Sequence, residues 1–115
     1  MMEMDIRPWG KYEVLLDTPN YKVKRITVKP GQRLSYQYHN HRSEVWTVVS
    51  GVGLYTIDGI SQEAGYGQSI KIKKRAHHRI ENEKDDLLVF IEVQTGTYFG
   101  EDDIVRLDDD YDRNK

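Results

Sequence analysis

The sequence contains no cysteine, which excludes disulfide bonds and thiol catalysis and is compatible with a reducing cytoplasm. It also lacks any apolar run near the roughly 20 residues that a membrane-spanning helix needs. The N-terminal residues MMEMDIRPWG carry acidic side chains and show no signal peptide. We therefore expect a cytoplasmic protein that does not contact membranes.

Charge of one sign is not in excess. The chain has 17 Lys and Arg against 19 Asp and Glu, so its formal net charge is −2. Nucleic-acid-binding domains are usually clearly basic, and we expect no nucleic-acid partner. At 115 residues the chain has room for one hydrophobic core, which predicts a single domain over residues 1–115.

No window places apolar residues at sustained helical spacing. Short strand-like runs instead alternate with Gly, Pro, Asn and Asp, and Asp58-Gly59 is a strong hairpin signal. We predict strands at residues 11–16, 21–29, 33–38, 44–49, 52–57, 60–64, 69–73, 79–81 and 87–93. A polar C-terminal tail from about residue 100 holds a short strand or turn at 104–107 and frays from about Tyr111. This pattern is typical of a small all-β sandwich or barrel.

Metal-ligand side chains are concentrated between Gly31 and Gly51. Gln37 and His39 share one face of an extended strand, and Glu44 begins the next strand after a short turn at residues 40–43. His78 is a further candidate later in the chain. Two imidazoles, one carboxylate and one amide oxygen suit a borderline divalent cation, and together they predict a four-ligand site with room for water or substrate.

The spacing of these residues resembles the two cupin signatures. Gly31, Gln37, His39, Glu44 and Gly51 match the first, with Gln37 in place of the usual first histidine. The second is matched by Gly67, Lys73, Arg75, His78 and Asn82, but Lys73 stands where that signature has proline and Arg75 where it has glycine. The resemblance implies an all-β cupin fold, the double-stranded β-helix or jelly roll.

Nearly the whole chain also resembles the type II phosphomannose isomerase family. The matching segments are residues 7–10 with Tyr12, 21–26, 30–31, 34–35, 37, 39, 41–42, 44, 46, 48–51, 78–79, 81–82, 91–94, 96, 98 and 100–106. Asn40 and Val45 depart from it, since many members have histidine at both places. The guanylyltransferase portion often fused to this domain is not in the chain, so nucleotide transfer is not expected.

This resemblance implies that Gln37, His39, Glu44 and His78 hold one divalent metal. Zinc is our first choice, with cobalt, manganese, nickel or iron as alternatives. It also implies interconversion of mannose 6-phosphate and fructose 6-phosphate. The Ser35, Gln37 and His39 pattern is similar to that of type I phosphomannose isomerases as well, where the serine lies at the substrate phosphate.

Aldose–ketose isomerisation moves a proton between two carbons and needs a base. His41 is our candidate because it lies near the ligands in sequence, although it could instead be a fifth ligand or a surface turn residue. His77 is weaker, because it should face away from His78. We group Arg106 with His41 as catalytic, the alternative being an ion pair with nearby acidic residues.

The substrate phosphate needs cationic partners, which arginine supplies well. We predict that Arg42 and Arg79 bind substrate together with Ser35. The lysines and arginine at residues 71–75 are interpreted as a solvated strand face.

Two other functions stay open. The chain could be a non-catalytic cupin that binds a sugar phosphate or another small carbohydrate ligand, or a metal-dependent cupin dioxygenase, against which Gln37 argues. Small cupins commonly pair through an edge strand, so we expect a homodimer.

Overall fold

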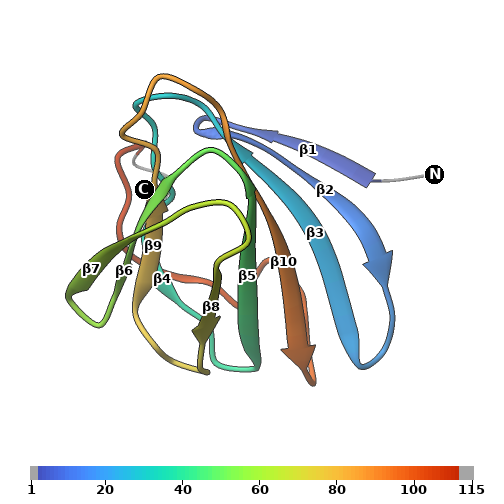
Figure 1. Cartoon of the computed structure of the whole chain (residues 1–115). Coiled ribbons are helices and arrows are strands. Elements are labelled where there is room, and N and C mark those ends of the chain that lie inside the picture. Colours follow the sequence, from blue (N-terminus) through green and yellow to red (C-terminus); the bar gives the residue numbers. More distant parts are fainter. Residues whose placement is uncertain (1–2, 112–115) are drawn as a thin grey trace.

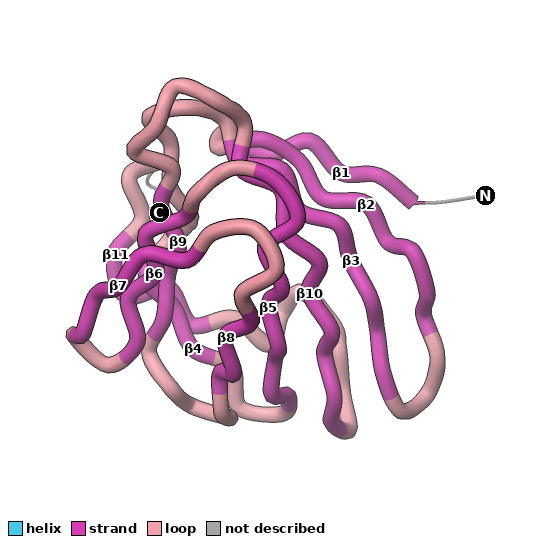
Figure 2. The backbone as a smooth tube through the Cα atoms, in the orientation of Figure 1, coloured by secondary structure: helices cyan, strands magenta, loops and turns pink. Residues whose placement is uncertain are grey.

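The computed structural model describes residues 3–111, which form eleven strands and no helix (Figures 1 and 2). The strands are β1 (Glu3–Arg7), β2 (Gly10–Asp17), β3 (Tyr21–Val28), β4 (Tyr36–Tyr38), β5 (Arg42–Ser50), β6 (Gly53–Ile57), β7 (Ile60–Ala64), β8 (Ser69–Ile72), β9 (His78–Glu81), β10 (Leu88–Gly96) and β11 (Val105–Asp108). The predicted all-β class is confirmed. Within these residues no helix could span a membrane.

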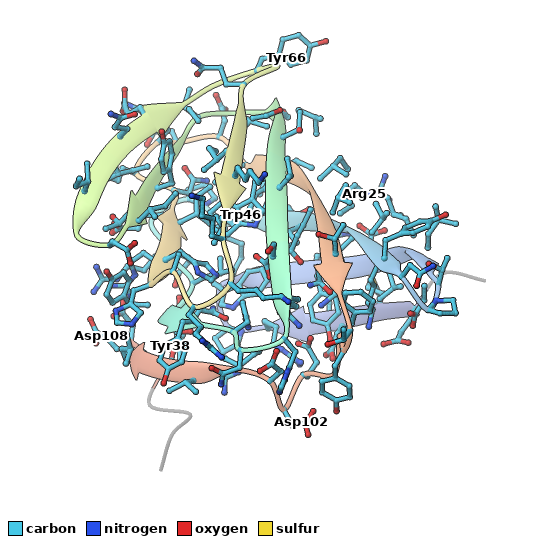
Figure 3. The ribbon with its side chains drawn as sticks, turned by 90° about the horizontal axis from the view of Figure 1, so that it is seen from below. Arg25, Tyr38, Trp46, Tyr66, Asp102 and Asp108 are labelled. Atoms are coloured by element: carbon cyan, nitrogen blue, oxygen red, sulfur yellow. The ribbon has the colours of Figure 1, made fainter. Side chains whose placement is uncertain are left out.

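The strands form two antiparallel sheets. One has the order β1-β2-β3-β10-β5-β8 and the other β11-β4-β9-β6-β7, so strands far apart in sequence are neighbours in both. The hydrophobic core lies between the sheets, and Figure 3 shows Trp46 in this interior while Tyr66 projects outward.

The inner face of the larger sheet changes from apolar to polar along its strands. Strand register aligns Ile26, Phe90 and Val48 in one row, all of them buried. The next row across the same strands aligns Lys24, Glu92 and Trp46, and the row after that pairs Gln94 with Glu44. Burial of the first row supplies about 1.5–3 kcal/mol per side chain. The polar rows place ionisable side chains at one end of the interior, where a functional site can form.

Two turns test the predicted loop residues. Asp58 and Gly59 both have positive φ, at 47° and 85°, as a two-residue hairpin turn requires, and they join β6 to β7 as predicted. Arg75 also has positive φ, at 66°. The loop before His78 therefore keeps a left-handed residue at the place where the cupin signature has glycine, although the side chain is arginine.

Other segments differ from the prediction. β1 was not predicted, because it is short and exposes Met4 and Ile6 instead of burying one apolar face. β4 covers less of its predicted range than the other strands do, and Arg33 reaches Glu81 through an isolated bridge. The predicted short strand near 104–107 is β11, which pairs with β4.

The C-terminal tail was predicted to fray from about Tyr111, but Tyr111, the last described residue, is held to the rest of the domain. The hydroxyl of Tyr111 donates a hydrogen bond to the side-chain oxygen of Gln32. The remainder of the predicted frayed end, residues 112–115, lies outside the described residues.

Candidate metal centre

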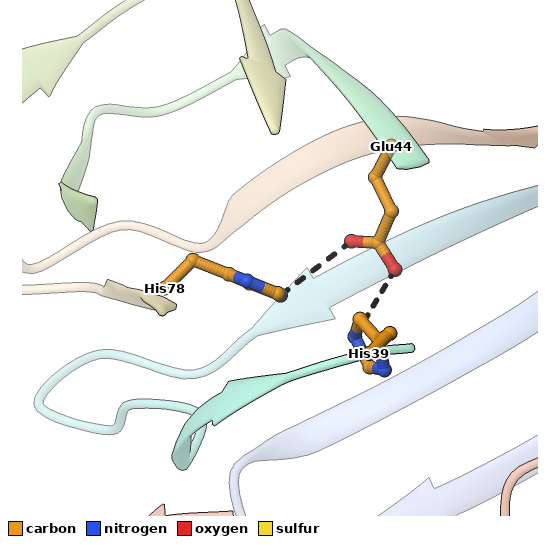
Figure 4. Close-up of side chains that lie close together, drawn as sticks. All are labelled: His39, Glu44 and His78. Carbon is orange, nitrogen blue, oxygen red and sulfur yellow. Dashed lines mark ion pairs between the residues drawn. The ribbon is translucent and has the colours of Figure 1, made fainter. Parts of the chain in front are cut away.

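Four side chains converge at the polar end of the interior. Gln37 on β4 pairs in register with His78, the first residue of β9. His39 follows β4, and Glu44 reaches in from β5 of the opposite sheet. One ligand atom from each of His39, Glu44 and His78 lies within 4.8 Å of the others, and Figure 4 shows both imidazoles directed at the Glu44 carboxylate.

Hydrogen bonds fix the orientation of both imidazoles. The Nδ1 of His39 donates to the backbone oxygen of Asp103 at 2.7 Å, and the Nδ1 of His78 donates to that of Ala76 at 2.8 Å. A carbonyl oxygen can only accept, so each Nδ1 carries the proton and each Nε2 presents its lone pair to the site. Histidines that bind metals are typically held in this way.

The electrostatics favour the protonation states that a metal needs. Burial, with help from the charges of Arg42 and His78, lowers the pKa of His39 to about 4, so its imidazole is neutral near pH 7. Burial pushes the pKa of Glu44 upward, but the charges of His78 and Arg42 outweigh it and hold that pKa below its usual value. The site therefore presents a neutral imidazole at His39 and a carboxylate at Glu44.

The donor set fits a divalent cation. His39 Nε2 lies 3.3 Å from Glu44 Oε2, and His78 Nε2 lies 3.8 Å from Glu44 Oε1. Ligands about 2.1 Å from a tetrahedral ion are separated by about 3.4 Å. The Gln37 amide nitrogen donates to Ser35 Oγ at 3.0 Å, which leaves its carbonyl oxygen as the donor atom toward a metal. Described residues therefore include a cluster able to bind a metal ion.

A cavity of about 60 Å³ opens beside this cluster. Both sheets contribute to its walls. Its lining residues are Arg7, Trp9, Tyr12, Lys24, Ile26, Leu34, Gln37, His39, Arg42, Glu44, His78, Glu92, Glu101, Ile104 and Arg106. All four predicted metal ligands line it, so the structure brings them together.

Two predicted substrate or catalytic arginines also line the cavity. Arg42 is buried; its Nε donates to Glu44 Oε2 at 3.0 Å, and its Nη2 lies 3.4 Å from His39 Nε2. Arg106 pairs in register with Gln37 across β11 and β4. Both cations thus lie beside the candidate ligands.

Three other predicted residues do not line the cavity. The exposed imidazole of His41 packs edge-on against Tyr98, while Ser35 is buried behind Gln37. Arg79 alternates with His78 on β9; its Nε donates to the backbone oxygen of Leu34, and its Nη1 lies 3.3 Å from Asp108. The geometry does not support direct substrate contact for Ser35 or Arg79, or proton transfer by His41.

Several residues at the site were not predicted. Glu92 is buried and accepts hydrogen bonds from the indole of Trp46 at 3.1 Å and the amide of Gln94 at 2.6 Å. Burial and the nearby Glu44 charge raise its pKa to about 7. The sequence could have indicated that Glu92 faces the interior, because it falls two residues after the core residue Phe90 and so lies on the same face of the strand.

Asp103 was also missed. Besides holding His39 through its backbone oxygen, its carboxylate accepts from the backbone N–H groups of Asn40 and His41 at 3.0 and 2.9 Å. No local pattern in the acidic segment Glu101-Asp102-Asp103 marks this one residue, since the contact spans more than 60 positions in sequence.

Comparison with known proteins shows which family the chain belongs to. The family model described as mannose-6-phosphate isomerase C-terminal matches residues 2–109. The chain is 50% identical over 107 residues to mannose-1-phosphate guanylyltransferase from Escherichia coli (strain K12), covering 93% of this chain and 22% of that protein. It therefore spans about a fifth of the length of this curated relative.

Solved structures confirm the cupin fold. The capsular polysaccharide assembling protein CapF from Staphylococcus aureus superposes with a TM-score of 0.83 at 23% identity, covering 94% of this chain and 34% of that one. A conserved protein with a double-stranded β-helix domain from Klebsiella pneumoniae gives a TM-score of 0.73 at 25% identity, over 83% of this chain and 76% of its own. These two likenesses show the fold alone.

Proposed function

Because the chain belongs to the mannose-6-phosphate isomerase C-terminal family, we propose that it is a metal-dependent isomerase that interconverts mannose 6-phosphate and fructose 6-phosphate. One observation carries the proposal. Two Nε2 lone pairs and the Glu44 carboxylate converge in a cavity that is also lined by arginine and lysine. This combination suits a substrate with oxygen donors at one end and an anionic group elsewhere.

In the proposal Gln37, His39, Glu44 and His78 hold the metal, with zinc as the first choice. A bound metal would act as a Lewis acid that stabilises negative charge on the substrate oxygens during isomerisation. Arg42 holds the Glu44 carboxylate through the hydrogen bond from its Nε, and it adds positive charge beside the same oxygens. Ser35 acts indirectly, because it orients the Gln37 amide.

The proton-transfer group must touch the substrate, so we replace His41 in the proposal by a carboxylate that lines the cavity. Glu92 is the candidate because the indole of Trp46 and the amide of Gln94 hold it in place, directly beside the row that contains Glu44. Arg106 remains a candidate for charge stabilisation, since it lies across from Gln37.

A coupled assay tests the proposal. Purified protein is stripped of metal, reloaded separately with zinc, cobalt, manganese or nickel, and assayed with mannose 6-phosphate. Turnover that disappears on chelation and returns with at least one metal is expected. Tight binding of mannose 6-phosphate without turnover under all four metals would instead identify a non-catalytic binding protein.

We further propose that the protein is a homodimer paired through an edge strand. β1 is the edge of the larger sheet, and it exposes Met4 and Ile6 on one side. Light scattering should give twice the chain mass, and Ile6→Lys should shift the protein toward monomer. A monomeric mass for the unmodified protein at micromolar concentration contradicts this assignment.

A further inference from the structure

The cavity has a second polar end, formed around Lys24. Lys24 lies on β3 directly across from Glu92 on β10, which in turn lies across from Trp46 on β5. Figure 1 shows β10 between β3 and β5. Adjacent strands are about 4.8 Å apart, so the backbones of β3 and β5 are separated by about 10 Å. This separation is comparable to the length of a hexose with a phosphate ester on its sixth carbon.

The ammonium group of Lys24 is buried in an unusual setting. Its side chain is 4% exposed, and its Nζ lies 3.1 Å from Glu101 Oε2 and 4.3 Å from the ring centroid of Tyr12. An ammonium group has three N–H donors, of which the bond to Glu101 uses one. Buried donors without acceptors are costly, so the cavity that Lys24 lines is where a further acceptor is favoured.

The side chains of Lys24 and Glu101 differ in how easily each can move away from the other. Lys24 projects from the middle of a central strand, whereas Glu101 belongs to the loop between β10 and β11 and its side chain is 39% exposed. Because its side chain is partly exposed, the Glu101 carboxylate can move into solvent when another anion takes its place beside Lys24. Without such an anion Lys24 would be left as a buried, unpaired charge, which is costly. The buried side chain of Lys24 cannot move into solvent in the same way.

Charge and volume both point to displacement of Glu101. The cations that line the cavity are Arg7, Lys24, Arg42 and Arg106, of which Arg7 pairs with Asp5 and Arg42 with Glu44. Lys24 pairs with Glu101, so withdrawal of the Glu101 carboxylate leaves the Lys24 ammonium group to be matched by another anion, such as a phosphate ester. This withdrawal also enlarges a cavity of about 60 Å³, far smaller than the roughly 300 Å³ or more of typical ligand pockets.

We propose that Lys24 binds the phosphate group of the sugar phosphate and that Glu101 occupies this phosphate position when no ligand is bound. This inference rests on the proposed function, because it assumes that the opposite end of the same molecule reaches the metal ligands. It assigns the phosphate to the Lys24 end of the cavity, in place of Arg79, which faces elsewhere. Lys24 and Glu101 are binding residues and take no part in proton transfer.

Calorimetry on the metal-free protein tests the subsite without any turnover. We expect mannose 6-phosphate to bind at least tenfold more tightly than mannose. Lys24→Met should abolish this preference, and Lys24→Arg should restore much of it. Glu101→Gln should bind mannose 6-phosphate at least threefold more tightly than the unmodified protein, because the competing carboxylate is neutralised.

Lys11→Met is the matched control, since Lys11 is an exposed lysine that pairs with Glu13 away from the cavity. It should retain the full preference for mannose 6-phosphate. Circular dichroism melting checks that each variant folds. If Lys24→Met does not fold, Glu101→Gln decides the question: unchanged or weaker binding of mannose 6-phosphate overturns the proposal.

Steady-state kinetics separates this inference from the proposed function. Where the metal-loaded protein turns over, Lys24→Met should raise KM at least tenfold and change kcat by less than threefold, as loss of uniform binding predicts. An unchanged KM in a folded Lys24→Met variant overturns the phosphate subsite and leaves isomerisation intact. Absence of turnover together with a Lys24-dependent phosphate preference overturns isomerisation and leaves the subsite intact.

Discussion

Arg42 and Glu44 lie two residues apart on β5 and form a buried ion pair, with Arg42 Nε 3.0 Å from Glu44 Oε2. Both side chains are at most 4% exposed. The guanidinium group therefore supplies positive charge at the same carboxylate that a metal would bind. Protein charge and metal charge should be partly interchangeable at this position.

Replacement of Arg42 should consequently be harmful mainly without metal. We expect Arg42→Ala to lower the free energy of unfolding of the metal-free protein by about 3–5 kcal/mol, because Glu44 is left buried without its partner. Under saturating zinc the loss should fall to less than half. Urea unfolding with and without zinc measures both values.

The pair of Arg25 and Glu13 on β3 and β2, away from the metal ligands, provides the control for this experiment. Arg25→Ala should lower stability equally with and without zinc. An equal loss for Arg42→Ala with and without zinc would show that the metal does not bind beside Glu44.

Metal content tests the ligand set directly. His39→Ala and His78→Ala should each lose stoichiometric metal while the strands stay folded, because each removes one converging Nε2 donor. His77→Ala is the matched control, since this neighbouring imidazole stacks on Tyr38 outside the cluster. Elemental analysis after dialysis provides the measurement, and full occupancy in both ligand variants refutes the site.

The depressed pKa of His39 predicts acid sensitivity of the metal-free protein. Its pKa is about 4 when folded, against an ordinary value of 6.5, so folding favours the neutral imidazole. The resulting stability, about 3 kcal/mol, is fully present above pH 6.5 and is lost as the pH falls toward 4. Urea unfolding across this range in the presence of a chelator should show the decline.

His39→Gln should flatten that decline, because the substituted side chain does not titrate. Identical pH profiles for the variant and the unmodified protein contradict the assignment to His39. The comparison of two profiles also removes contributions from carboxyl groups that titrate in the same range.

The Asp103 side chain should influence the site without touching a metal ligand, because it holds the backbone next to His39. Asp103→Ala removes the acceptor for two backbone N–H groups next to His39, and we expect a loss of about 1–3 kcal/mol in stability. Metal affinity should fall about 10–100-fold, as is usual when a group that supports a ligand is removed. Competition with a fluorescent zinc chelator measures the affinity, and exposed Asp102→Ala should show much smaller effects.

The left-handed conformation of Arg75 predicts a stabilising substitution. A side chain at positive φ, such as that of Arg75, costs about 1–2 kcal/mol in the folded state. Glycine removes this cost, but part of the gain is lost because glycine gives the unfolded chain more conformational freedom. Arg75→Gly should raise stability by about 0.5–1 kcal/mol. Lys74→Gly, at a neighbouring position without positive φ, should lower it, and thermal melting of both variants checks the contrast.

The sequence predicted most strands because alternation and turn residues are local. Alternation along the predicted strand at residues 44–49 puts Glu44, Trp46 and Val48 on one face, and all three are buried. The Asp58-Gly59 hairpin was predicted for the same reason. β1 escaped prediction because Met4 and Ile6 face outward, so no buried alternation marks it.

The residues of the candidate site were also only partly predictable from the sequence. The spacing of Gln37, His39, Glu44 and His78 identified a set of side chains that the fold brings together. Lys24 and Glu101 were not identified, since their contact depends on a loop that folds back across 77 positions of sequence. The role of His41 stays a prediction; proximity along the chain does not determine which way a residue faces in a turn, and its imidazole packs against Tyr98.

The bond between His39 and Asp103 also bears on how the protein matures. Asp103 emerges from the ribosome 64 residues after His39, and β11, which pairs with β4, emerges later still. A nascent chain can therefore form its early hairpins but cannot fix the imidazole of His39 until Asp103 has been synthesised. Metal capture should accordingly follow the synthesis of strands β1 to β10.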